Sequence, residues 1–113
     1  MKLPYRENVH ISKRKLTDYL LSETHPIGRW KAKFFRALGF NETNVNLLFE
    51  GFKKIAHSED VLEVTSSAHG TKYVVEGSLF TPKEGHVYVK TVWIVDKDQD
   101  RPRFVTAYPL EKS

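Results

Sequence analysis

The chain has 113 residues, a length typical of one domain, and 40% of them are hydrophobic, which is enough for a packed interior. It contains no cysteine, which excludes disulfides and thiolate metal sites and favours a cytoplasmic location. We expect no secretory signal, because residues 1–6 lack its apolar core, and no membrane span, because every apolar run is too short. The net charge of +4 permits a nucleic acid partner without requiring one.

The first half of the chain shows helical patterns. Residues 1–10 are expected to form an arm. Ser12 can then cap a helix that runs to about residue 21 and carries Leu16, Tyr19 and Leu20 on one face. Most of the positive charge lies here, since residues 10–36 hold seven Lys and Arg against two acidic residues, a net charge of +5.

Two further helices are predicted before residue 60. Pro26 suits the first position of a helix, where its missing N–H has no cost, and Gly39 suits a left-handed cap at its end. The third helix should cover residues 43–57, which carry a regular apolar stripe.

After residue 60 the apolar period changes to two. Short loops separate the predicted strands, which favours antiparallel neighbours. The expected fold is therefore α+β, with three N-terminal helices followed by a four-stranded antiparallel meander, and one sheet face buried against the helices. We expect a single domain over residues 1–113, with a helical part at 11–57 and a sheet part at 60–109. The strands are predicted at residues 61–64, 72–79, 87–95 and 104–108.

Lys31 is the most informative residue of the second helix. A helical wheel places it inside the apolar stripe, whereas Arg29 and Lys33 fall on the solvated side. A lysine on a buried stripe is costly unless its ammonium finds a polar partner. Either the stem packs and the charge reaches solvent or a carboxylate, or the charge projects to a polar patch on the sheet and binds phosphate there. The stripe itself is predicted to comprise Ile27, Trp30, Phe34, Phe35 and Leu38.

His25 is a candidate general base. The following proline favours an extended backbone at this residue, and the helix N-terminus favours a neutral imidazole. A neutral imidazole can accept a proton at neutral pH, and helix N-terminal N–H groups attract phosphate. The alternative is that His25 is only an N-terminal cap or an exposed polar residue.

Polar residues also interrupt the apolar faces of the last two strands. Thr91 lies between Val89 and Trp93, and Thr106 lies between Phe104 and Tyr108. If these strands pair, Thr91, Thr106 and Tyr108 could share a face, with Arg103 opposite under strict alternation. The alternative is that threonine is simply a favoured strand residue. We consider Arg29, Lys33, Tyr73 and Arg103 as candidate nucleic acid contacts.

Such residues can cleave RNA without a metal. A base deprotonates the 2′-hydroxyl, cations hold the phosphate and an acid protonates the leaving 5′-oxygen. The candidate catalytic residues are His25, Lys31, Thr91, Thr106 and Tyr108. No metal-ligand spacing, Gly-rich nucleotide loop or nucleophile elbow is present, so neither a metal nor a cofactor is expected.

Several segments resemble an uncharacterised family of small bacterial and cyanobacterial domains. The segments are residues 16–22, 25–35, 38–40, 70–77, 91–94 and 102–109. The resemblance implies a domain that occurs alone or at the end of polymorphic toxins, often encoded beside a small β-barrel protein. The helices-then-sheet layout is also similar to the barnase–EndoU–colicin–RelE ribonuclease superfold, although fold alone does not imply function.

The leading hypothesis is a metal-independent endoribonuclease of the toxin type, with RNA as substrate and a small neighbouring antitoxin as partner. Two alternatives stay open. The first is a non-catalytic nucleic-acid-binding module, and the second is a protein-interaction partner of the antitoxin or immunity type. Antitoxins that mask a basic nuclease tend to be acidic, so the charge of +4 counts mildly against the last alternative.

Overall fold

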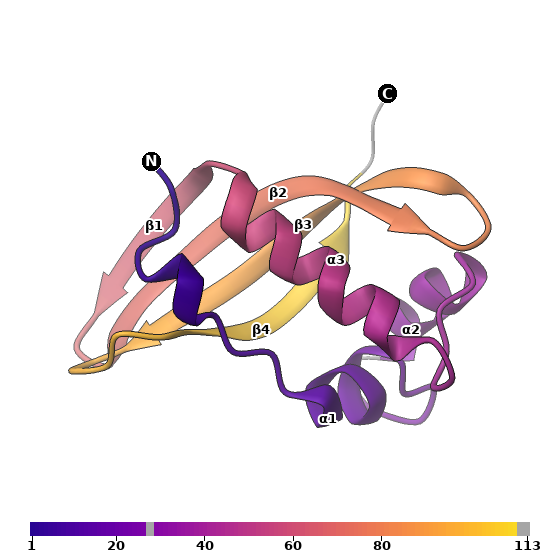
Figure 1. The fold of residues 1–113 in the computed structure, drawn as a ribbon. Helices are drawn as coiled ribbons and strands as arrows, with labels where there is room; N and C mark the ends of the chain where they lie inside the picture. The colour runs from indigo at the N-terminus through magenta and orange to yellow at the C-terminus, as the bar shows by residue number, and fades with distance from the viewer. Residues whose placement is uncertain (27–28, 111–113) are drawn as a thin grey trace.

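A computed structural model describes residues 1–26 and 29–110. The α+β prediction is confirmed: three helical segments precede a four-stranded antiparallel sheet in the order β1-β2-β3-β4 (Figure 1). Within the described residues, no helix combines the length and apolar character needed to cross a bilayer. The elements are a 3-10 turn (Arg6–Asn8), α1 (Lys13–Lys15), the π-helical segment η2 (Leu16–Leu20), α2 (Arg29–Ala37), α3 (Val45–Ser58), β1 (Val61–Ser67), β2 (Gly70–Thr81), β3 (Gly85–Asp96) and β4 (Pro102–Pro109).

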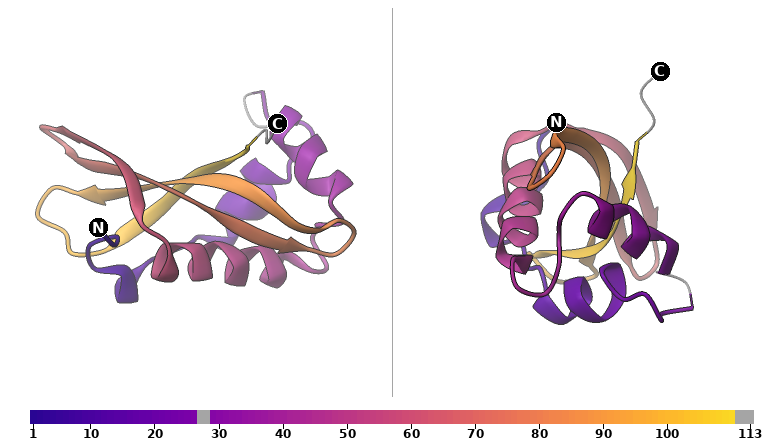
Figure 2. Two further views of the ribbon diagram at one scale, coloured as in Figure 1. Left: turned by 90° about the horizontal axis from the view of Figure 1, so that it is seen from above. Right: turned by 90° about the vertical axis from the view of Figure 1, so that its right-hand side faces the viewer.

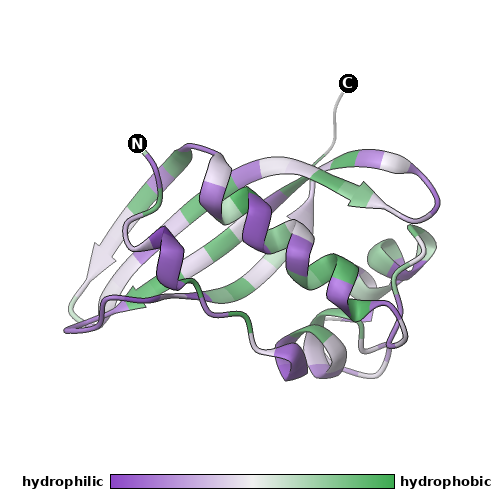
Figure 3. Ribbon diagram, viewed as in Figure 1, coloured by the Kyte–Doolittle hydropathy of each residue, from purple (hydrophilic) through white to green (hydrophobic). Residues whose placement is uncertain are grey.

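The main core lies between α3 and the sheet. Helix α3 crosses one face of the sheet (Figure 1), and hydrophobic residues recur along it (Figure 3); its buried residues are all apolar. Trp93 is fully buried at the centre of this layer and its ring contacts that of Phe104, which in turn stacks on Phe52 of α3. Gly77 allows the close approach of β2 to α3, because a Cβ there would lie 2.9 Å from the side chain of Ile55.

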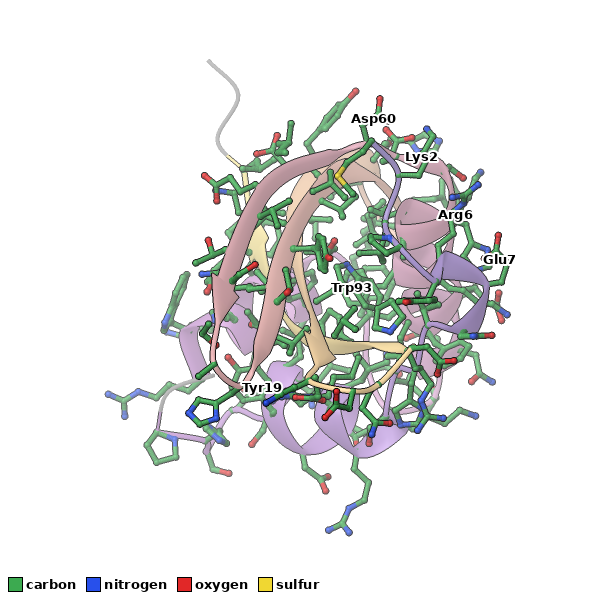
Figure 4. All side chains as sticks on the ribbon, turned by 90° about the vertical axis from the view of Figure 1, so that its left-hand side faces the viewer. Lys2, Arg6, Glu7, Tyr19, Asp60 and Trp93 are labelled. Carbon is green, nitrogen blue, oxygen red and sulfur yellow. The ribbon has the colours of Figure 1, made fainter. Side chains whose placement is uncertain are left out.

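The N-terminal arm packs along the molecule. Leu3 is fully buried in the core, and Lys2 forms a bridge with Asp60 at the start of β1. Figure 4 shows Lys2 and Asp60 side by side at one end of the molecule, consistent with the 3.5 Å separation of their charged groups. At its other end the arm runs beside β4, where the His10 N–H donates to the Pro102 carbonyl.

The predicted first helix is present, but its hydrogen bonds change from the α pattern in α1 to the π pattern in η2. One α turn is followed by a π segment, in which the Leu21 N–H donates to the carbonyl of Leu16, five residues earlier. Leu16 and Leu20 are buried, and Tyr19 is half-buried between them and the sheet. Single π turns are uncommon and occur often at functional sites.

Helix α2 ends at Ala37, and Gly39 follows it with a φ of 103°, the predicted left-handed conformation of a C-terminal cap. The helix begins at Arg29 rather than at Pro26, and Ile27 of the predicted stripe lies outside the described residues. Lys31 and Phe35 are buried as the wheel predicted. The prediction for Trp30 is wrong, because this side chain is 56% exposed.

A β-bulge in β4 decides which side chains share a face. Val92 pairs with Thr106 but Trp93 pairs with Phe104, so Val105 is an extra residue on β4. The bulge reverses the alternation that a regular strand would have. As a result Thr106 and Tyr108 lie on the sheet face opposite the core, which we call the second face. Its other members on β2, β3 and β4 include Lys72, Val74, Glu76, Lys90, Val92, Ile94, Asp96 and Arg103.

Helix α2 and segment η2 pack at the β4 side of the sheet (Figure 2), where Phe35 of α2 also contacts Phe52 of α3, with ring centres 6.1 Å apart. The sequence predicts that the helices cover one face of the sheet, but their side chains reach both faces. Helix α3 covers the core face, while side chains of α2 and η2 reach Thr106 on the second face. This arrangement brings a helical lysine against the polar residues of β4.

Candidate functional site

A buried ammonium group is the centre of the candidate site. The Lys31 side chain is only 5% exposed, and its Nζ donates hydrogen bonds to Tyr19 Oη and Thr106 Oγ1, each 3.0 Å away. The two hydroxyls lie 3.1 Å from each other, so the three polar atoms form a closed triangle. Among the described residues no carboxylate lies within 4.0 Å of this ammonium.

Aromatic rings supply much of the remaining surroundings of the ammonium. Lys31 Nζ lies 4.2 Å from the centre of the Tyr108 ring and 5.5 Å from that of Tyr19. Cation–π contacts of this kind partly replace the water that a buried cation loses. Hydroxyls and rings, rather than a counterion, therefore hold the charge, which leaves it able to attract an anion.

Tyr19 was not selected as a site residue from the sequence. Burial alone would raise the pKa of its phenol, but hydrogen bonds from Lys31 and Thr106 and the charges of Lys31 and Lys15 outweigh burial. The net result is a pKa below the ordinary value of 10.0. One sequence signal existed, since a tyrosine on an apolar helical stripe needs a partner for its hydroxyl.

His25 joins this group through Tyr19. Their rings meet edge to face with centres 4.9 Å apart, and the imidazole is half-buried. The His25 carbonyl accepts a hydrogen bond from the Arg29 N–H, which fixes its backbone at the entry to α2. We call the set Tyr19, His25, Lys31, Thr106 and Tyr108 the Lys31 cluster. Figure 4 shows Tyr19 in the lower part of the molecule, apart from Trp93 near its centre.

Thr91 does not belong to the cluster. It pairs with Ala107 and faces the core, where its hydroxyl donates to the Val75 carbonyl at 2.7 Å and accepts from Trp93 Nε1 at 2.8 Å. The expectation that Thr91 and Thr106 share a face is therefore wrong. The bulge at Val105 is the physical reason, and Thr91 instead satisfies the buried indole N–H.

The candidate nucleic acid contacts divide between faces. Arg103 lies on the second face together with Thr106, contrary to strict alternation, and pairs with Asp96 through bonds of 2.7 and 3.2 Å. Tyr73 lies on the core face opposite Trp93, so it is separated from the Lys31 cluster by the sheet. Arg29 and Lys33 are exposed on α2 and line a hollow with Trp30 and Glu23.

A hollow of about 240 Å³ is also present on the second face. Lys72, Ile94 and Arg103 lie in one row across its floor, and residues of β1 and of the β1–β2 turn form its wall. In the described part of the chain, no three His, Asp or Glu side chains are grouped so that they could hold a metal ion.

Comparison with known proteins identifies relatives. The structure is similar to a chain of the "Contact-dependent growth inhibition toxin - immunity protein complex" from Klebsiella pneumoniae 342, with a TM-score of 0.73 and 21% sequence identity. The alignment covers 96% of this chain and 98% of that chain, and at this identity it establishes a shared fold. A search among curated proteins gave no match. Residues 2–111 match the model of DUF6883, a domain of unknown function, and the chain therefore belongs to this family.

Proposed function

We propose that the protein is a toxin-type, metal-independent endoribonuclease that acts in the cytoplasm and whose active site is the Lys31 cluster. The observation that carries the proposal is the buried Lys31 ammonium, which has two hydroxyl partners and no carboxylate among the described residues. Burying a cation without a counterion costs free energy, and packing alone does not explain why a lysine stands here. Binding of an anion would stabilise the buried charge and would explain it. A phosphodiester is such an anion.

The cluster holds the groups that the reaction needs. In the proposed reaction the His25 imidazole accepts the proton of a 2′-hydroxyl, and the 2′-oxygen attacks phosphorus. Lys31 and the Thr106 hydroxyl stabilise the added negative charge on the phosphoryl oxygens. The P–O5′ bond breaks as the Tyr19 phenol gives its proton to the 5′-oxygen. The products are a 2′,3′-cyclic phosphate and a 5′-hydroxyl end.

Tyr19 is a better acid than an ordinary phenol, because Lys31 and Thr106 stabilise its ionised form. The phenolate left after proton transfer remains hydrogen-bonded to both residues. Tyr108 keeps the cation in place through its ring face rather than taking part in proton transfer. The assignment thus gives each member of the cluster a separate role.

Induced expression in a bacterial host tests the proposal, with growth and total RNA integrity as readouts. Lys31→Met and His25→Ala should abolish growth arrest and RNA fragmentation. Lys31→Met should still fold, because Tyr19 and Thr106 remain hydrogen-bonded to each other. Lys54→Met is the matched control, since Lys54 is an exposed residue of α3 on the other side of the sheet.

Purified protein should cut RNA in the presence of a chelator and leave cyclic phosphate ends. Intact RNA with folded wild-type protein would reject the nuclease. Loss of cleavage on chelation would reject the metal-independent mechanism specifically.

The likeness to a chain of a toxin–immunity complex supports a second candidate, a role as the protein-binding partner in such a pair. The toxin role predicts that a co-expressed neighbouring protein relieves growth arrest. The immunity role predicts the reverse, namely that this chain is harmless and protects the host from another protein. Co-expression in both directions distinguishes the two.

A further inference from the structure

The hollow on the second face lies next to the Lys31 cluster along the sheet. The register of the strands places Lys72, Ile94 and Arg103 in one row, and Val74, Val92 and Thr106 in the adjacent row. Two residues along a strand separate these rows, which is about 7 Å. A ligand group in the hollow would therefore be a near neighbour of a group held at Thr106.

The chemistry of the hollow differs from that of a phosphate site. Arg103 is paired with Asp96 through two hydrogen bonds, so the local charge of this pair is close to neutral. The hydrogen bond from Arg103 also lowers the pKa of Asp96, which keeps the carboxylate ionised and able to accept further hydrogen bonds. A second phosphate would gain little from such a pair.

A flat heterocycle suits the hollow better. A guanidinium held by a carboxylate presents a rigid planar face, and arginine planes of this kind stack on nucleobases. Ile94 provides an apolar surface beside it, and Thr65 and Ser67 provide hydroxyls on the wall. Asp96 can accept an N–H from an exocyclic amino group, which adenine, guanine and cytosine carry and uracil lacks.

We propose that this hollow is a nucleobase subsite, which binds the base next to the phosphate held at the Lys31 cluster in single-stranded RNA and disfavours uracil. The proposal rests on the proposed ribonuclease function for the identity of the neighbouring phosphate. Its own prediction concerns binding, and can be tested without any cleavage.

The test is a titration of the isotopically labelled full chain with AMP, GMP, CMP, UMP and ribose 5-phosphate, followed by amide resonances in an NMR spectrum. The first three nucleotides should shift resonances of residues 67–72 more strongly than UMP. Ribose 5-phosphate, which has no base, should affect only residues near the Lys31 cluster.

Two variants on edge strand β1 provide the matched comparison. Thr65 lines the hollow, so Thr65→Trp should fill it and weaken AMP, GMP and CMP binding about tenfold, the order contributed by stacking of one base. Val64 is the adjacent residue, pairs with Tyr73 and points to the opposite face, so Val64→Trp should leave binding unchanged. Equal effects of the two variants would overturn the proposal.

The results also separate the subsite from the nuclease. Base-dependent shifts at residues 67–72 in a protein that cuts no RNA would support the subsite and reject the nuclease. RNA cleavage combined with nucleotide shifts no larger than those of ribose 5-phosphate would support the nuclease and overturn the subsite.

Discussion

Lys31 shows how a single residue can conflict with its position in the fold. Its stem lies on the buried stripe of α2, as the helical period predicts, yet its charge has to be held by neutral groups. The charge of Lys31 and its hydrogen bond to Tyr19 also help to lower the pKa of the Tyr19 phenol. Local conflicts of this kind in natural proteins often mark functional sites.

The coupling between Lys31 and Tyr19 gives a prediction at the residue scale. Lys31→Met removes a hydrogen bond and a nearby charge, so the pKa of Tyr19 should rise from its lowered value toward or above 10.0. A pH titration of the tyrosine ring carbons by NMR measures this directly. An unchanged Tyr19 pKa in the variant would show that Lys31 does not act on the phenol.

The sign of the pH dependence follows from the same shift. Because the folded-state pKa lies below the unfolded value, ionisation of Tyr19 stabilises the folded protein only at alkaline pH, and this gain is lost as pH falls through the folded pKa. Proton donation requires the neutral phenol. Cleavage by the wild type should therefore decline as pH rises through the lowered pKa of Tyr19.

At the scale of elements, the bulge in β4 places the site on the second face. Strict alternation from Phe104 would turn Thr106 into the core, and the extra residue Val105 prevents this. It also explains why Arg103 and Thr106 share a face although they are three positions apart, an odd spacing that would put them on opposite faces of a regular strand. The segment η2 has a comparable role, since it delivers Tyr19 to the same point of β4.

Two single-residue deletions test the role of the bulge. Deleting Val105 should give a regular ladder that keeps Thr106 and Tyr108 on the second face, at a cost of about 1 kcal/mol of unfolding free energy. Deleting Ala107 should turn Tyr108 toward the core and cost about 3 kcal/mol or more. Chemical denaturation compares the two variants, and similar costs would contradict this account of the bulge.

At the scale of the whole molecule, charge and topology act together. Lys15 and Lys31 both lie over the Tyr19 ring, and Arg29 and Lys33 are exposed on α2. The net charge of the chain is only +4, so the field is local rather than global. Such a distribution favours attraction of a polyanion to one region of the surface.

Salt dependence tests this distribution. If Lys15, Lys31 and Lys33 each neutralise one phosphate, single-stranded RNA binding should weaken about 20-fold between about 50 mM and about 200 mM salt. The Lys31→Met variant should show a shallower salt dependence, whereas Lys54→Met should match the wild type. Binding that is insensitive to salt would argue against phosphate contacts at these residues.

The fold class can be predicted from local sequence patterns, because the change of apolar period near residue 60 and the short loops leave few arrangements other than helices followed by an antiparallel meander. It also identified Lys31 as buried, since helical periodicity is a local property. Strand ends were less accurate: β2 extends over Gly70–Thr81, whereas the prediction covered residues 72–79. The strands are longer than predicted because polar residues next to the turns also pair across the hairpins, as Thr81 does with Gly85.

Which of the candidate residues come together depends on contacts between distant segments, and the sequence patterns do not contain these contacts. The bulge at Val105 put Thr106 on the face of Arg103 and away from Thr91, which faces the core, and no local pattern indicates an extra residue in a strand. The partnership of Lys31 with Tyr19 and Thr106 joins residues up to 75 positions apart. Such contacts depend on how α2 and η2 pack beside β4, and that packing is set by the whole core rather than by any one segment.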